Sequence, residues 1–148
     1  MNALLMTRLA QADVSDLPDW AAAAALNAPD AALPVVVTWE RTNTGVGSIL
    51  HALGPQDGAV LLDNLAALAT TDVVLRWGLR TLERGVLDLS LPSTRAQINA
   101  LVIAGAMTST QREALFLLSR RERHPSWAEF NNLNVDARAV GIARGAKE

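Results

Sequence analysis

A chain of 148 residues without cysteine can bury the core of one domain, and it excludes a disulfide framework and thiolate chemistry. A formal net charge of −2 at pH 7 excludes a general electrostatic attraction to nucleic acid or to anionic membranes. Half of the residues are hydrophobic and only 19% are charged, so we infer that part of the apolar surface is buried against another chain.

The sequence has neither a membrane-spanning run nor a secretory signal. No window approaches the ~18 uninterrupted apolar residues that a membrane helix requires. Residues 1–12 lack the basic region and the long apolar run of a signal peptide. We therefore expect the protein in the cytoplasm or in an assembly made there.

The N-terminal residues predict two short helices and a connector. Three leucines share one face of a predicted helix over residues 2–11. Pro18 suits the first turn of a second helix, which is expected to end at Asn27. Residues 28–34 contain two prolines and predict a rigid connector.

One stretch, residues 35–39, has a β-strand pattern, because it is β-branched and aromatic throughout. A single strand needs a partner. The candidates are residues 86–90 and residues 133–135. We expect a small two-stranded patch on a helical body.

Three helices are predicted next, over residues 46–53, 56–69 and 73–84. A cap within residues 42–44 begins the first, and Gly54 with the following proline ends it. In the third, leucines at i, i+4 and i+7 share one face.

Residues 93–124 predict a helical hairpin around which the chain is organised. The first helix ends near Gly105, and a capping box at Thr108 or at Thr110 begins the second. The apolar run 114–118 indicates a central helix packed on several sides, and the basic residues before Pro125 indicate its C-terminal end. A DNA-binding helix-turn-helix is less favoured, because the second helix has few polar groups near its start.

Short helices over residues 126–129 and 136–143 complete a mainly α fold. We expect a single helical domain over residues 1–148 with about six to seven short helices and a possible two-stranded β patch. Residues 1–34 are its N-terminal arm and connector, and residues 35–148 are its main body.

No motif predicts catalysis, a cofactor or a metal. The segment 44–48 contains a Gly-x-Gly between strand and helix, but it lacks the other residues of a nucleotide-binding loop. The two histidines have no helical metal-binding neighbours. Three aspartates within residues 13–19 are interpreted as helix caps. We therefore expect no catalytic, cofactor or metal site.

Six residues are candidates for contact with a partner protein. An exposed tryptophan is a natural anchor at an interface, although most tryptophans are expected in the core. The basic residues near position 120 are interpreted first as a solvated helix end, with an acidic partner or a phosphate as alternatives. The candidate contact residues are Trp20, Trp39, Trp127, Arg120, Arg121 and Arg123.

The order of several segments resembles a group of small proteins of tailed bacteriophages. Residues 16–30 read DLPDWAAAAALNAPD, and residues 104–115 read AGAMTSTQREAL. Residues 125–129 (PSWAE) and 135–144 (VDARAVGIAR) continue the resemblance, which covers most of the chain. It implies a phage origin and a role in the virion or tail region. It carries no functional residues with it.

Two functions from different classes follow. The first is a non-enzymatic structural or assembly subunit of a tailed phage particle, bound to itself or to other virion proteins and located in the virion or the host cytoplasm. The second is a small phage regulatory protein that binds DNA or a host protein through the hairpin 93–124. The first predicts association that salt does not disrupt, and the second predicts salt-sensitive DNA binding.

Overall fold

The computed structural model describes residues 2–145 of the chain. This part is 56% helical and contains nine helices and a two-stranded antiparallel sheet. The predicted mainly α class with a β patch is confirmed. The helices outnumber the six or seven expected, because several separate helices are only one or two turns long.

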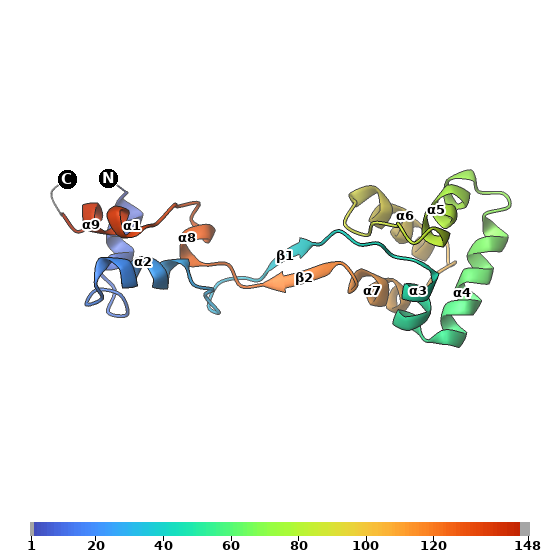
Figure 1. Cartoon of the computed structure of the whole chain (residues 1–148), viewed down its shortest axis with the longest axis horizontal. Coiled ribbons are helices and arrows are strands. Elements are labelled where there is room, and N and C mark those ends of the chain that lie inside the picture. Colours follow the sequence, from blue (N-terminus) through green and yellow to red (C-terminus); the bar gives the residue numbers. More distant parts are fainter. Residues whose placement is uncertain (1, 146–148) are drawn as a thin grey trace. The chain divides into compact units, whose positions relative to one another are not determined.

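The chain forms two compact units (Figure 1). Unit 1 contains the residues up to Val36 and those from Glu122 onward, and unit 2 contains Val37–Arg121. The first segment of unit 1 ends close to the boundary expected after residue 34. The C-terminal residues, which we had placed in the main body, join the N-terminal residues in unit 1.

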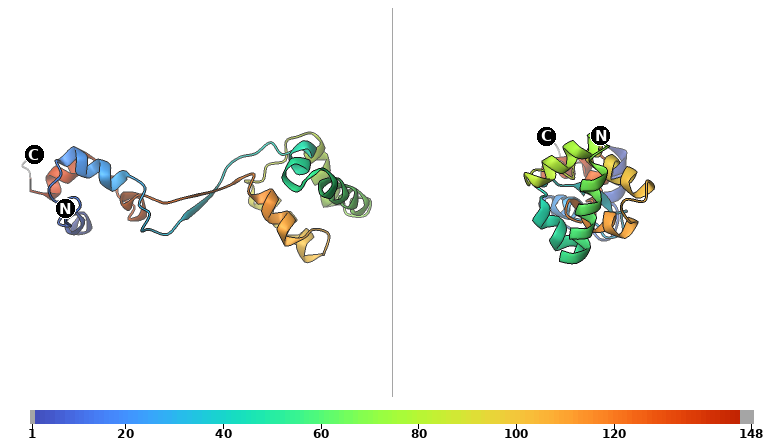
Figure 2. Two further views of the ribbon diagram at one scale, coloured as in Figure 1. Left: turned by 90° about the horizontal axis from the view of Figure 1, so that it is seen from below. Right: turned by 90° about the vertical axis from the view of Figure 1, so that its right-hand side faces the viewer.

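Unit 1 is a small group of helices in which the C-terminal helix α9 (Ala137–Ala143) packs against the N-terminal helices α1 (Ala3–Leu9) and α2 (Asp19–Asn27). In Figure 2 the blue N-terminal helices and the red C-terminal helix lie together. Its buried core includes Leu5, Leu26 and Val140. Asp136 accepts a hydrogen bond from the N–H of Ala139 and caps the last helix. Unit 1 also contains α8 (Trp127–Phe130).

Arg144 ties the C-terminal helix of unit 1 to the loop before α2. Its Nη1 donates to the carbonyl oxygen of Leu17 at 2.6 Å and to Asp19 Oδ1 at 2.8 Å. Its Nη2 donates to the carbonyl oxygens of Val14 at 2.8 Å and Ser15 at 3.2 Å. One guanidinium therefore supplies hydrogen-bond donors to three backbone carbonyl oxygens of a loop that has little regular secondary structure.

Unit 2 contains the five central helices of the described chain and its own core. Buried Ile49, Leu65 and Phe116 belong to this core. Thr108 accepts a hydrogen bond from the N–H of Gln111, whose side chain accepts one from the N–H of Thr108, so one of the two predicted capping boxes is present. The helices are α3 (Val46–Leu53), α4 (Pro55–Leu68), α5 (Val73–Glu83), α6 (Pro92–Ile103) and α7 (Ser109–Phe116).

The predicted strand exists, but both predicted partners are wrong. Strand β1 (Val36–Trp39) pairs with β2 (Arg120–Arg123). Residues 86–90 instead form an isolated antiparallel bridge in which Leu87 exchanges backbone hydrogen bonds with Thr44. The chain passes from unit 1 to unit 2 along β1 and returns along β2.

The predicted helical end over residues 119–124 is also wrong. Helix α7 ends at Phe116. Within the apolar run, Leu115 and Phe116 are buried, whereas Leu117 is 59% exposed. The hydroxyl of buried Ser119 donates a hydrogen bond of 2.6 Å to the carbonyl oxygen of Glu40. The N–H of Glu40 donates a hydrogen bond of 2.9 Å to the carbonyl oxygen of Ser119. These long-range bonds favour an extended chain over another helical turn.

Candidate partner-binding site

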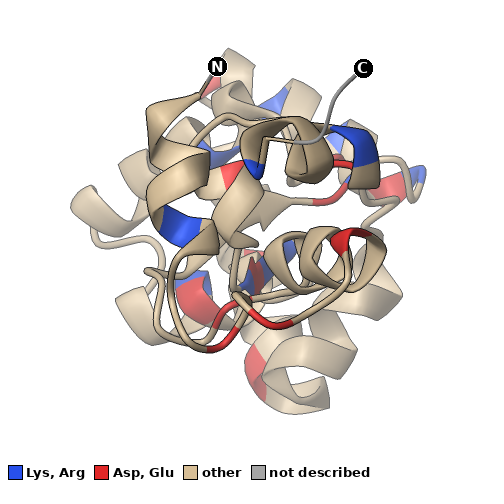
Figure 3. Cartoon of the chain, turned by 90° about the vertical axis from the view of Figure 1, so that its left-hand side faces the viewer, with Lys and Arg blue, Asp and Glu red and all other residues tan. Residues whose placement is uncertain are grey.

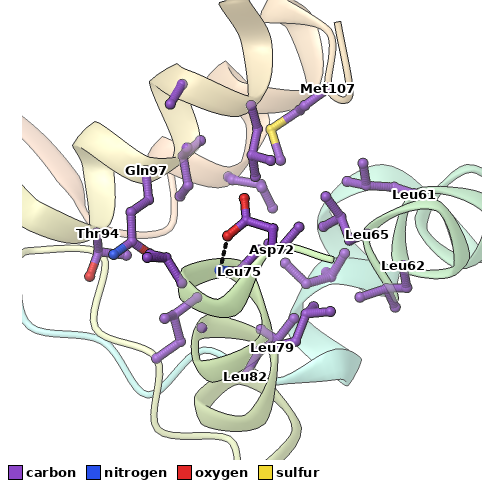
Figure 4. Close-up of a pocket in the computed structure, with 18 of the residues that line it drawn as sticks. Leu61, Leu62, Leu65, Asp72, Leu75, Leu79, Leu82, Thr94, Gln97 and Met107 are labelled. Carbon is purple, nitrogen blue, oxygen red and sulfur yellow. Dashed lines mark hydrogen bonds between the residues drawn. The ribbon is translucent and has the colours of Figure 1, made fainter. Parts of the chain in front are cut away.

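Unit 2 contains an apolar cavity of about 320 Å³ between its helices (Figure 4). Leucines make up half of the residues that line it, and most of these leucines come from α4, α5 and α6. Met107 lies on one side of the cavity. A cavity of this size is within the range that proteins use for small molecules or for a partner's side chains. The leucine residues in its wall are Leu61, Leu62, Leu65, Leu75, Leu79, Leu82, Leu87, Leu89, Leu101 and Leu115.

Small residues on α5 and α6 leave this cavity open. A Cβ atom at Gly78 would lie 3.6 Å from Gln97 Oε1, so α5 and α6 approach each other at this point. The cavity wall on α6 also includes exposed Ala100 and Ala104, whose methyl groups reach only a short way from the helix. The space between the two helices is therefore not filled by their own side chains.

Three polar side chains line the cavity: Asp72, Thr94 and Gln97. Asp72 caps α5, because its Oδ1 accepts a hydrogen bond of 3.0 Å from the N–H of Leu75. Figure 4 shows its second carboxylate oxygen directed into the space between α5 and α6. Among the described residues, the hydrogen bond from Leu75 is the only one that this carboxylate accepts.

Exposed apolar side chains border the cavity. On α5, Val73, Val74 and Trp77 are 57%, 58% and 59% exposed. On α6, Ile103 is 88% exposed. Trp77 follows the cavity residue Val74 by three positions, and Ile103 follows the cavity residue Ala100 by three, so each lies beside the cavity wall on its helix. We call the cavity with this border the α5–α6 cleft.

The basic residues of β2 are paired with glutamates inside the chain. Arg120 Nη1 lies 3.2 Å from Glu113 Oε2. Arg121 Nε lies 3.1 Å from Glu40 Oε2. Glu40 lies about 80 positions before β2, so no local pattern indicates its pairing with Arg121. Glu113 lies only seven positions before Arg120, but in the continuous helix predicted here the two side chains would be two turns apart.

Arg123 is held by two hydrogen bonds to Glu129, one of them from Nη1 to Oε2 at 2.7 Å. These bonds hold the pKa of Glu129 below its usual range and raise the pKa of Arg123. Figure 3 shows positive and negative positions mixed rather than gathered by sign. The predicted contact arginines therefore do not present an uncompensated basic surface.

The tryptophans differ in environment. Trp20 is 70% exposed on α2. Trp39 packs edge-to-face on Phe116, with ring centroids 5.4 Å apart, and Trp127 packs on the core of unit 1. Trp77, which was not among the predicted contact residues, is exposed on α5. An interface anchor is exposed in the free protein, and of the three predicted contact tryptophans only Trp20 is exposed in this way.

The Gly-x-Gly segment forms the start of α3. The N–H of Gly45 donates to Ser48 Oγ at 3.2 Å, and a Cβ at Gly45 would lie 3.1 Å from Gly85 Cα. Glycine at this position thus allows close backbone packing. The helix begins after Gly45, and not with a side-chain cap from residues 42–44 as expected.

Two of the three aspartates near α2 form ion pairs rather than the helix caps that we expected. Asp13 pairs with Arg8 at 2.7 Å, and Asp19 pairs with Arg144. Pro18 occupies the cap position of α2 and makes no side-chain hydrogen bond there. In residues 2–145, no three acidic or histidine side chains are grouped so that they could hold a metal ion.

No protein-family model, curated protein or solved structure matches this chain. No residue role can therefore be transferred from a relative. Within the described residues, no helix has the length and apolar character needed to cross a bilayer. The α5–α6 cleft is the feature of the described chain that best suits the binding of another molecule.

Proposed function

We propose that this protein is a non-enzymatic structural or assembly subunit of a tailed phage particle and acts through protein–protein contacts. The single observation that carries the proposal is the exposed apolar border of the α5–α6 cleft. The phage setting, in the virion or the host cytoplasm, rests on the resemblance described for residues 16–30, 104–115, 125–129 and 135–144. Its partners would be other virion proteins or further copies of itself.

The exposed border supports association because contiguous apolar surface is unfavourable in water. Burying apolar surface contributes about 25 cal/mol per Å². Val73, Val74 and Trp77 lie within two turns of one helix, and each is more than half exposed. Large contiguous apolar patches on soluble proteins commonly mark contact sites.

The chemistry of the cleft suits binding better than catalysis. The residues that line the cavity include no histidine, lysine, serine or tyrosine. Asp72 is occupied in part by the cap of α5, and no hydrogen bond joins it to Thr94 or Gln97 in the described structure. General acid–base or nucleophilic catalysis needs such paired groups within hydrogen-bond reach.

The alternative of a DNA-binding hairpin gains less support. Arg120 and Arg121 lie on a strand rather than at a helix end, and both pair with glutamates. A protein that binds DNA needs cations free to neutralise phosphates. Repulsion from the paired glutamates would weaken such contacts.

Light scattering on the purified full chain at low and at moderate salt tests the proposal. We expect an oligomer that persists at moderate salt, or aggregation in the absence of a partner, because apolar contacts are not screened by ions. A highly soluble monomer at both salt concentrations would contradict the proposal. Loss of the oligomer at moderate salt would favour electrostatic contacts and the regulatory alternative.

A further inference from the structure

We propose that the α5–α6 cleft binds an amphipathic helix of a partner protein, with aliphatic side chains in the cavity and a lysine or arginine against Asp72. This inference rests on the proposed function and specifies the chemistry of the partner. Three properties of the cleft support it: its apolar border, its unpaired carboxylate oxygen and its length.

The apolar border favours a helix over a small molecule. A ligand contained in the 320 Å³ cavity would leave Trp77 and Ile103 in water, because both lie outside the cavity wall. A helix that lies across the opening would cover both side chains while its own side chains enter the cavity. Helix-in-groove complexes combine these two contacts.

The charge of the cleft favours a cation on that helix. Asp72 is the only charged residue among those that line the cavity. The nearest arginine in sequence, Arg76, donates to the carbonyl oxygens of Ala69 at 3.1 Å and Thr70 at 3.0 Å. Arg80 lies 4.7 Å from the ring centroid of Trp77. Since neither arginine pairs with Asp72, its carboxylate is available to a cation from outside.

The length of the cleft matches a short helical motif. Cavity residues on α5 extend from Val74 to Leu82, which corresponds to about 12 Å along the helix axis. Side chains at i, i+4 and i+7 of a partner helix extend over about 10 Å. Three aliphatic anchors at this spacing therefore fit the cleft, with the cation one turn beyond them, at the end where Asp72 lies.

The test uses a synthetic probe and the full chain with labelled methyl groups. The probe is an alanine-based helix of about 20 residues, long enough to be partly helical in water. It carries leucines at i, i+4 and i+7 and one lysine a turn further on. Methyl NMR titration should show shifts at Val74, Leu101 and Ala104, which line the cavity. A second peptide with glutamate in place of lysine should bind about fivefold more weakly, since one charge pair contributes up to about 1 kcal/mol.

Three variants locate the binding. Asp72→Asn should remove the preference for the lysine peptide without unfolding α5, because asparagine caps a helix as well as aspartate does. Ala100→Leu places a larger side chain at the cavity and should abolish binding. Ala96→Leu, at an exposed position of α6 outside the cavity wall, should leave binding unchanged.

Other results would overturn the inference. Absence of methyl shifts in the cleft would exclude this helix as an occupant. Equal affinity for both peptides would indicate an apolar pocket without charge selection, and self-association through the cleft that an excess of the lysine peptide does not reverse would indicate a second copy as the occupant. Persistence of the oligomer in light scattering without peptide binding would contradict this inference and leave the proposed function standing.

Discussion

At the scale of single residues, a few side chains fix loops in place through hydrogen bonds to backbone groups that no helix or strand pairs. Arg144 is the clearest case, because its four hydrogen bonds close the loop before α2 onto the C-terminal helix. Neither the loop carbonyls nor Asp19 could be assigned to Arg144 from sequence, since more than a hundred residues separate them. The capping residues Asp72, Thr108 and Asp136 could be predicted, because their partners lie within three residues.

Replacing Arg144 should destabilise unit 1. Arg144→Gln removes the charge and most of the bonds to the carbonyls, so we expect the free energy of unfolding to fall by about 2 kcal/mol. Urea denaturation followed by circular dichroism measures the change. The control is Arg84→Gln at an exposed position of unit 2, which should change stability by less than about 0.5 kcal/mol. Equal effects of the two variants would contradict the role of Arg144.

Asp88 should make the stability of unit 2 depend on pH. Hydrogen bonds from Ser90, then from the N–H of Thr42, hold the pKa of Asp88 below its usual range, and Arg41 at 3.9 Å adds to this effect. Because the folded pKa is lowered, the stabilisation is fully present above the unfolded pKa of about 4 and is lost as the pH falls through the folded pKa.

We therefore expect the free energy of unfolding to decline between pH 5 and pH 2, and to decline less in Asp88→Asn. Denaturation curves at several pH values give this difference. Asp13 and Glu129, whose pKa values are also lowered by arginine partners, contribute in the same direction and remain in the variant. An identical decline in both proteins would show that Asp88 does not contribute.

At the scale of elements, the local sequence pattern predicted helices well, but it did not predict the strand that forms by long-range pairing. Helices α3, α4 and α5 could be predicted within two residues at either end, because their apolar spacing, caps and glycines act locally. Strand β2 could not be predicted, since the basic sequence Arg-Arg-Glu-Arg suits a helix end equally well. Its extended form depends on hydrogen bonds to residues some 80 positions away, and no local signal encodes that pairing.

Ser119 should be important for this change from helix to strand. Ser119→Ala removes the hydroxyl that donates to the carbonyl oxygen of Glu40. We therefore expect the free energy of unfolding to fall by about 1–2 kcal/mol. Ser109→Ala, at the exposed start of α7, is the matched control and should have a smaller effect. If both substitutions are neutral in thermal denaturation, the bond to Glu40 does not stabilise the sheet.

At the scale of the whole molecule, the chain has two separate cores. The core of unit 1 combines both ends of the sequence, whereas the core of unit 2 comes from the continuous middle. Apolar periodicity identifies which side of each helix is buried, but it does not specify which helices share a core. The α5–α6 cleft was equally beyond prediction, because an unfilled space depends on how several helices pack.

Two cores should unfold as two transitions. Leu26→Ala in unit 1 and Phe116→Ala in unit 2 each remove buried apolar volume, which typically costs about 2–5 kcal/mol. Differential scanning calorimetry should show that each variant lowers the midpoint of a different transition. A single transition lowered equally by both variants would mean that the units unfold cooperatively.

If the border of the α5–α6 cleft is a protein contact surface, the mass of the protein in solution should depend on its exposed apolar side chains. The most direct test is the solution mass by light scattering of the full chain, of Trp77→Ser/Ile103→Ser, and of Val60→Ser, which alters a comparably exposed residue on α4. We predict that the wild type and Val60→Ser associate at moderate salt and that the cleft variant has the mass of a monomer. Equal association of all three proteins, or a monomeric wild type, would contradict this role of the border.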